Sequence, residues 1–151
     1  MINLLLMSHA VLGSLLGLAG VWLFVDVLNA KEENQARIRT ISLIVAGLMW
    51  LTYLLAGYFY VVYYSVDKAF ILKGPWTFAH NFFMETKEHV VIMLLLLATF
   101  LPIMAYNNLA ANKGARKIVL WATGLMILTT VAMEGAGAII SMGVRVALLP
   151  K

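Results

Sequence analysis

The stretch IVLWATGLMILTTVAMEGAGAIISM, residues 118–142, decides the fold of this chain. It is a long apolar run in which Glu134 is the only ionisable side chain. A helix needs roughly 20 mostly apolar residues to cross the hydrocarbon core of a bilayer. Three further runs of comparable length and apolar character lie at residues 2–27, 41–64 and 86–107. The sequence therefore predicts four membrane-spanning segments.

The composition of the whole chain supports this prediction. Hydrophobic residues make up 63% of the 151 residues and charged residues only 12%, whereas soluble domains carry roughly a quarter charged residues. Lipid offers the backbone no hydrogen-bond partner, and the apolar runs are too long for barrel strands, so each run is expected to be a helix. We expect an all-α integral membrane four-helix bundle that forms one domain over residues 1–151, with both termini on the same side.

The N-terminal run and the absence of cysteine restrict the protein further. The first run has no basic segment before it and no cleavage site close behind it, so we expect it to remain as the first helix. The chain has no cysteine, which excludes disulfides, iron–sulfur clusters and covalently attached haem. A cofactor must therefore be held by His, Met, Glu, Asp or Tyr. Nothing in the sequence indicates a soluble enzyme or a nucleic-acid-binding protein.

The distribution of basic residues predicts the orientation in the membrane. With four spans, one face (side A) carries both termini and the connection at residues 65–88. The other face (side B) carries the connections near residues 29–40 and 107–117. Cytoplasmic loops are enriched in Lys and Arg, and side B holds six of these residues against five on side A. We therefore expect both termini on the non-cytoplasmic side of a bacterial or archaeal inner membrane.

The connection on side A is the longest, and its Gly74-Pro75 pair predicts a turn. Proline at the first position of a helix would start the third helix near Trp76. Polar and aromatic residues around this connection are expected in water or at the membrane surface: Tyr63, Tyr64, His80, Lys87 and Glu88.

Three ionisable side chains are predicted to lie in the side A half of the spans, namely His9, His89 and Glu134. A charged carboxylate near the bilayer centre costs at least ~2.5–3.5 kcal/mol, so Glu134 must face the interior of the bundle. Counting along the helices places His9 about 12 Å and Glu134 about 16 Å from side A, and His89 nearer the surface. This common depth on three helices is the strongest functional signal in the sequence.

Glycine and tyrosine residues share helix faces with these polar groups. Gly13 and Gly17 follow His9 at spacings of four, which places all three on one side of the first helix. Such a stripe usually packs helices together, but it also leaves room for a flat macrocycle bound to the imidazole. Tyr53 and Tyr60 share a face of the second span and are expected to hydrogen-bond a haem propionate, a quinone carbonyl or Glu134.

Two histidines on different helices are what a b-type haem with two axial imidazoles requires. Our leading hypothesis is that His9 and His89 bind one haem b, with Glu134 as a proton relay or a hydrogen-bonding partner of an imidazole. The chain resembles small four-helix b-type membrane subunits in its architecture and in these paired histidines. This resemblance implies an electron-transfer subunit of a membrane oxidoreductase that connects the quinone pool with a membrane or periplasmic redox subunit.

Two alternatives stay open. In the first, His9, Glu85, His89 and Glu134 bind zinc, iron or copper, although no HExxH spacing occurs. In the second, the chain is a cofactor-free anchor or scaffold subunit of a membrane complex or a homo-oligomer. Glycines would then pack the helices, and the polar residues would bind neighbouring subunits.

Overall fold

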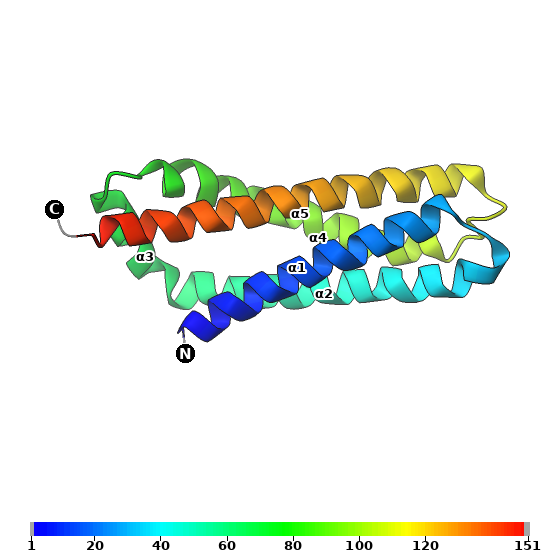
Figure 1. Ribbon diagram of the computed structural model, residues 1–151, viewed down its shortest axis with the longest axis horizontal. Coiled ribbons are helices and arrows are strands. Elements are labelled where there is room, and N and C mark those ends of the chain that lie inside the picture. Colours follow the sequence, from blue (N-terminus) through cyan, green and yellow to red (C-terminus); the bar gives the residue numbers. More distant parts are fainter. Residues whose placement is uncertain (1, 150–151) are drawn as a thin grey trace.

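The computed structural model describes residues 2–149, which form a bundle of four long antiparallel helices (Figure 1). These helices are α1 (Ile2–Leu28), α2 (Gln35–Val62), α4 (Glu85–Ala105) and α5 (Lys113–Ala147). All four belong to segments that are long and apolar enough to cross a membrane. α1 and α4 each pack against both α2 and α5, and the two ends of the chain lie at the same end of the bundle (Figure 1). The predicted all-α four-helix bundle is confirmed.

Two helices extend well beyond the predicted spans. α2 begins at Gln35 instead of residue 41, and α5 covers Lys113–Ala147 instead of residues 118–142. Hydropathy marks only the part of a helix that is apolar enough for hydrocarbon, whereas backbone hydrogen bonding continues into polar sequence. Asn112 then caps α5 by accepting a hydrogen bond from the backbone N–H of Ala115. The sequence therefore predicted the spans better than it predicted the helix ends.

The side A connection contains a helix that we did not predict from the sequence. α3 (Tyr64–Lys73) ends at Gly74, whose N–H donates to the carbonyl oxygens of Phe70 and Ile71. The predicted turn at Gly74-Pro75 is present, but the chain becomes helical again only after Trp76 and Thr77. It then forms the π-helical segment η2 (Ala79–Met84), which continues directly into α4.

Close contacts with α5 explain why α3 and η2 fold as they do. Ile71 and Ala79 are fully buried, and both face Gly143 of α5. A Cβ atom at Gly143 would lie 2.8 Å from the Cβ of Ala79 and 3.6 Å from the side chain of Ile71. The sequence did not predict α3, because its burial depends on α5, which lies far along the chain.

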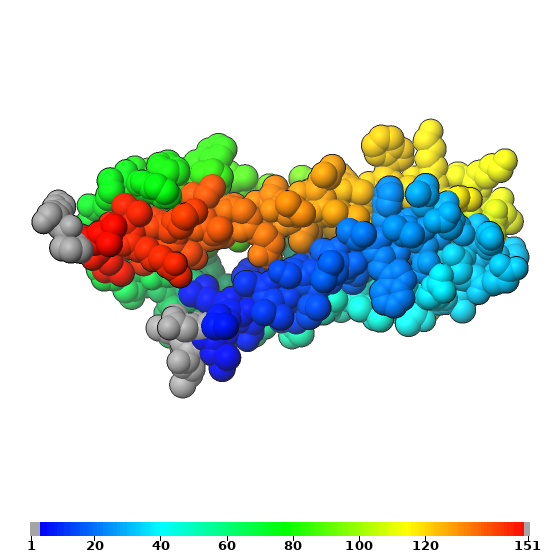
Figure 2. Space-filling view, in the orientation of Figure 1, coloured from blue at the N-terminus to red at the C-terminus, as the bar shows by residue number. Residues whose placement is uncertain are grey.

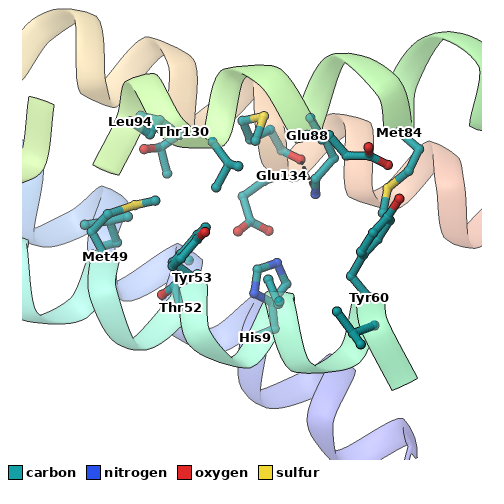
Figure 3. A pocket seen from close by; sticks show the side chains of 18 residues that line it. His9, Met49, Thr52, Tyr53, Tyr60, Met84, Glu88, Leu94, Thr130 and Glu134 are labelled. Atoms are coloured by element: carbon teal, nitrogen blue, oxygen red, sulfur yellow. Dashed lines mark hydrogen bonds between the residues drawn. The ribbon is translucent and has the colours of Figure 1, made fainter. Parts of the chain in front are cut away.

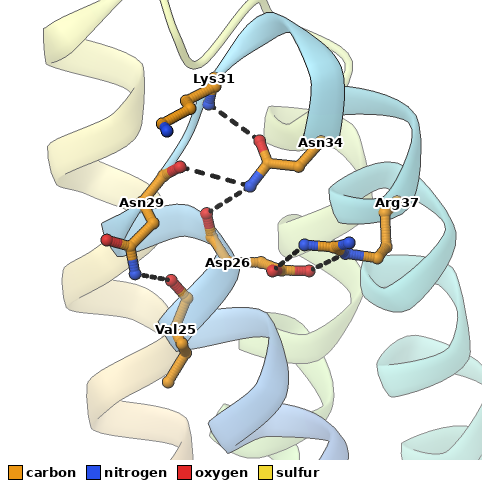
Figure 4. Close-up of polar contacts among 6 residues, drawn as sticks. All are labelled: Val25, Asp26, Asn29, Lys31, Asn34 and Arg37. Carbon is orange, nitrogen blue, oxygen red and sulfur yellow. Dashed lines mark hydrogen bonds and ion pairs between the residues drawn. The ribbon is translucent and has the colours of Figure 1, made fainter.

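At the side B end, an ion pair between the buried Asp26 and the exposed Arg37 joins α1 to α2 (Figure 4). Asp26 is only 6% exposed and accepts two hydrogen bonds of 2.7 Å from the guanidinium of Arg37. Asn34 closes the turn between the helices, since its side chain accepts from the N–H of Lys31 and donates to the backbone oxygen of Asp26. The carboxylate of Asp26 lies within the first predicted span, and this pairing compensates for its charge.

The packed core and the lipid-facing surface occupy different parts of the bundle. Fully buried residues such as Leu23, Ile38, Leu101 and Val119 fill the side B half. Large apolar side chains lie exposed along the outside of the helices, as a bilayer requires, for example Leu4, Val11, Leu18 and Val25 of α1. In the side A half, by contrast, the helices enclose open space.

Candidate functional site

A cavity of about 390 Å³ lies between the four long helices in the side A half (Figure 3). Apolar side chains such as Leu16, Met49 and Leu94 form much of its wall. Its polar lining comes from all four helices: His9, Thr52, Tyr53, Tyr60, Lys87, Glu88, Thr130 and Glu134. Small-molecule sites have this size and this mixture of apolar wall and few polar groups.

A second cavity of about 300 Å³ adjoins the first and reaches toward α3. The two share His9, Tyr60, Lys87 and Glu134 in their walls. Figure 2 shows an opening between the N-terminal part of α1 and the C-terminal half of α5, the helices that line much of this second cavity. The polar groups are therefore reachable from outside the bundle.

His9 and Glu134 point toward one another across the first cavity (Figure 3). The Nδ1 atom of His9 is buried and has no hydrogen-bond partner among residues 2–149. A buried polar atom without a partner costs about 1–3 kcal/mol. An imidazole kept in this state beside a carboxyl group is therefore available to a ligand or to water.

Gly13 makes room for the Glu134 carboxyl group. A Cβ atom at Gly13 would lie 1.8 Å from Oε1 and 3.0 Å from Cδ of Glu134. Gly17 faces the methyl group of Thr130, and Gly20 faces the end of Met126. The glycine stripe thus packs α1 against α5, and the Glu134 carboxyl group occupies the space directly beside Gly13.

Lys87 lies inside the bundle, so our expectation that it meets water was wrong. Its Nζ atom donates a hydrogen bond of 3.1 Å to the backbone oxygen of Met133 on α5. A Cβ atom at Gly137 would lie 3.1 Å from this Nζ, so a second glycine leaves room for a polar side chain. Glu88 also lines the first cavity, and its Oε1 atom is buried without a partner in the described part of the chain.

His89 faces away from both cavities. Its side chain is exposed, and its Nδ1–H donates a hydrogen bond of 2.6 Å to the backbone oxygen of Glu85, one turn earlier on the same helix. His89 is absent from the lining of either cavity, whereas His9 lines both. The structure therefore does not bring His9 and His89 together, and the predicted ligand pair is not assembled.

The direction of His89 follows from the periodicity of α4. The buried residues Leu94, Ala98 and Leu101 define the face of α4 that packs in the bundle. Counting back along this face in steps of three and four gives Val91 and then Lys87. His89 lies two residues from Lys87, which is about 200° around the helix. The small residues Ala98 and Ala105 on this face were a signal in the sequence that points toward Lys87, but the burial that defines the face comes from the structure.

The alternative metal site is not assembled either. Within residues 2–149, no three His, Cys, Asp or Glu side chains are arranged to hold a metal ion. Of the four residues that we considered, only His9 and Glu134 share a cavity. The side chain of Glu85 is 49% exposed and lies beside His80.

The tyrosines divide into two groups. Tyr53 and Tyr60 line the first cavity, on the face where we expected them. Tyr64 and His80 were expected at the surface, and this was wrong: they are 3% and 4% exposed, and the Tyr64 hydroxyl lies 2.9 Å from Nδ1 of His80. No sequence pattern indicated this pair, because its burial depends on α3 and on the π-helical turn of η2.

The chain matches no known protein family, no characterised protein and no solved structure in the comparisons made with each. The chemistry of the site must therefore be argued from its geometry. The cavity places an imidazole, an ammonium group, two carboxyl groups and phenol hydroxyls in an apolar enclosure. Such a set can hydrogen-bond a carbonyl compound and exchange protons with it.

Proposed function

We propose that this protein is a membrane electron-transfer subunit that binds a quinone headgroup in the His9–Glu134 cavity and exchanges protons with it. Each quinone carbonyl accepts hydrogen bonds, and reduction to the quinol adds two electrons and two protons. The imidazole of His9 and the ammonium group of Lys87 can donate to a carbonyl, and Glu134 can carry a proton. The electrons would come from a redox subunit that docks on this chain.

One observation carries the proposal, namely the buried and unpartnered Nδ1 of His9 in the same cavity as the Glu134 carboxyl group. A residue that serves only to pack helices would not need this costly arrangement. Gly13 and Gly137 make room for Glu134 and Lys87 beside it. The apolar remainder of the wall suits a quinone ring, and the opening between α1 and α5 suits a lipophilic molecule that arrives from the bilayer (Figure 2).

Calorimetric titration of the purified protein with short-chain ubiquinone and menaquinone analogues tests this function. We expect His9→Ala to weaken binding by about tenfold, because one hydrogen bond to a carbonyl is lost. His89→Ala is the matched control, since His89 lies on the same half of the bundle but outside both cavities. Equal affinity of the wild type and His9→Ala, or no binding of either analogue by the wild type, would refute the proposal.

A haem is the second candidate, because three methionine thioethers line the cavity that His9 enters, those of Met49, Met84 and Met133. Haem iron accepts a histidine together with a methionine. Reduced-minus-oxidised visible spectra of His9→Ala and His89→Ala distinguish histidine–methionine ligation from the His9–His89 pair that the sequence predicted. Loss of the haem bands in His9→Ala alone would support histidine–methionine ligation, whereas loss in both variants would support the histidine pair.

A further inference from the structure

Three polar side chains lead from the side A surface into the bundle. The carboxyl group of Glu85 is half exposed, and its Oε1 atom lies 3.5 Å from Nε2 of His80. On the other edge of the same ring, Nδ1 of His80 lies 2.9 Å from the hydroxyl of Tyr64. His80 is itself 4% exposed. A buried imidazole thus bridges a surface carboxyl group and a buried phenol.

Tyr64 in turn borders the second cavity. That cavity is also lined by Asp67, His9, Lys87 and Glu134. Its volume of about 300 Å³ and its polar groups suit water molecules, which need two to four polar partners each. Tyr64 and Glu134 therefore border one space that water can fill.

The local backbone holds His80 in this position. His80 lies in the π-helical turn Ala79–Met84, directly before α4. Such wide turns inside helices occur frequently at functional sites. The close contact between Ala79 and Gly143 fixes η2 against α5, while Tyr64 comes from the first turn of α3. Tyr64, His80 and Glu85 therefore come from three successive elements, α3, η2 and α4, and their contacts do not simply cap the end of one helix.

We propose that Glu85, His80 and Tyr64 form a proton path from the side A surface to the cavity that contains His9 and Glu134. This inference rests on the proposed function, because proton exchange with a quinone requires a route between that cavity and water.

The transfer conserves protons and charge at each step. A proton from the Glu85 carboxyl group binds Nε2 of His80, and the ring then carries a proton on both nitrogens. The Nδ1 proton moves to the Tyr64 oxygen while the original hydroxyl proton passes to water in the second cavity. His80 is left neutral with its proton on Nε2, and rotation of the ring and of the hydroxyl restores the starting arrangement.

The groups around Tyr64 keep its hydroxyl protonated between transfers. Burial raises the pKa of the Tyr64 phenol, and the negative charges of Asp67, Glu85 and Glu88, together with Tyr60, raise it further. Burial also raises the pKa of Asp67. Lys87 and Glu134 line the far side of the same cavity. The phenol therefore acts by exchanging one proton for another and does not need to ionise fully.

A pH jump on the protein in nanodiscs, followed by time-resolved infrared spectroscopy, tests the path without any quinone. The signal is the carboxyl C=O band of protonated Glu134, identified as the band that Glu134→Gln removes. We expect Tyr64→Phe and His80→Ala each to slow the response of this band by roughly 100-fold, since positioned proton carriers contribute on that order. Imidazole added to the buffer should restore part of the rate in His80→Ala.

Tyr63→Phe is the matched control, because Tyr63 is the neighbouring residue and contacts the rings of Tyr58 and Phe59 instead of His80. It should respond at the wild-type rate. Wild-type rates in Tyr64→Phe, or a wild-type Glu134 band that does not respond to the jump, would overturn the path. Quinone titration of Tyr64→Phe and His80→Ala separates the proton path from the quinone site. A slow response of the Glu134 band together with unchanged quinone affinity supports the path. If the wild type binds no quinone, the proposed function fails, but the infrared measurement still tests the path.

Discussion

At the scale of single residues, small side chains decide where polar side chains can lie. Gly13 and Gly137 leave the space that the Glu134 carboxyl group and the Lys87 ammonium group occupy. Glycine inside a helix costs up to about 1 kcal/mol relative to alanine, so its use here indicates that the space is needed. The function of this site therefore depends on residues that carry no chemistry themselves.

Gly13→Ala tests this dependence. The added methyl group would lie 1.8 Å from Oε1 of Glu134, so we expect Glu134 to be displaced and the protein to lose about 1–3 kcal/mol of stability through overpacking. Quinone affinity should fall as well. The measurement is thermal unfolding in detergent, followed by titration.

Gly57→Ala provides the comparison for Gly13→Ala. Gly57 lines the same cavity, but a Cβ atom there would have nothing within 4 Å. We expect its unfolding temperature to equal or exceed that of the wild type. If Gly13→Ala unfolded at the wild-type temperature too, the tight fit between α1 and Glu134 would be wrong.

At the scale of secondary-structure elements, the rotation of each helix about its own axis determined which of the predicted residues line the cavities. Depth alone indicated His9, His89 and Glu134, but depth does not specify direction around the helix axis. Residues on both faces of α4 are apolar, since one faces lipid and the other faces the bundle. In the sequence, only the small residues Ala98 and Ala105 distinguish the face of α4 toward the bundle from the face toward lipid. Counting back from Ala98 in steps of three and four residues leads to Lys87.

The elements are joined at side B by Gln35 at the start of α2. Its side-chain amide donates to the backbone oxygens of Ala105 and Asn107, at 2.8 and 2.9 Å, and its Oε1 accepts from the N–H of Leu109 at 3.0 Å. Gln35 is buried, so these backbone groups have little access to water. One side chain thus fastens α2 to the end of α4 and to the loop that follows.

Gln35→Leu should therefore destabilise the protein by about 2–4 kcal/mol, because three hydrogen bonds are lost and their buried partners remain. Gln35→Glu keeps the acceptor for the N–H of Leu109 but places a carboxylate oxygen against the backbone oxygens of Ala105 and Asn107, so we expect it to destabilise the protein at least as much as Gln35→Leu. Denaturant unfolding in mixed micelles measures both. A loss below 0.5 kcal/mol in Gln35→Leu, roughly half of one typical hydrogen bond, would contradict this assignment.

At the scale of the whole molecule, one half of the bundle is tightly packed and the other half encloses cavities. The side B half is packed by fully buried apolar side chains and joined by Gln35 and the Asp26–Arg37 pair. The side A half contains both cavities and is covered by α3 and η2. We infer that side B supplies most of the stability and that side A carries the function.

The absence of native cysteine allows a direct test of this topology. In intact and opened spheroplasts, a membrane-impermeant maleimide should label Ser65→Cys from one side of the membrane only. Lys31→Cys and Ala111→Cys, at the other end of the bundle, should react from the opposite side. All three residues are exposed.

The positive-inside rule predicts that Ala111→Cys, which keeps all six basic residues of side B, reacts only after the spheroplasts are opened. The reverse pattern would overturn the predicted orientation but not the fold. Labelling of Ser65→Cys and Ala111→Cys from the same side would be incompatible with four antiparallel spans.

The sequence by itself determined the all-α bundle and its four apolar spans, because a backbone in lipid must satisfy its own hydrogen bonds and hydropathy therefore specifies helices. It also identified His9, Glu134, Tyr53 and Tyr60, which the structure places around one cavity. Only the tertiary structure decided that Lys87 and Glu88 face this cavity, that His89 faces away, and that His80 is buried beside Tyr64. These directions depend on the rotation of each helix about its axis, which is set by contacts with distant helices and by the π-helical turn before α4.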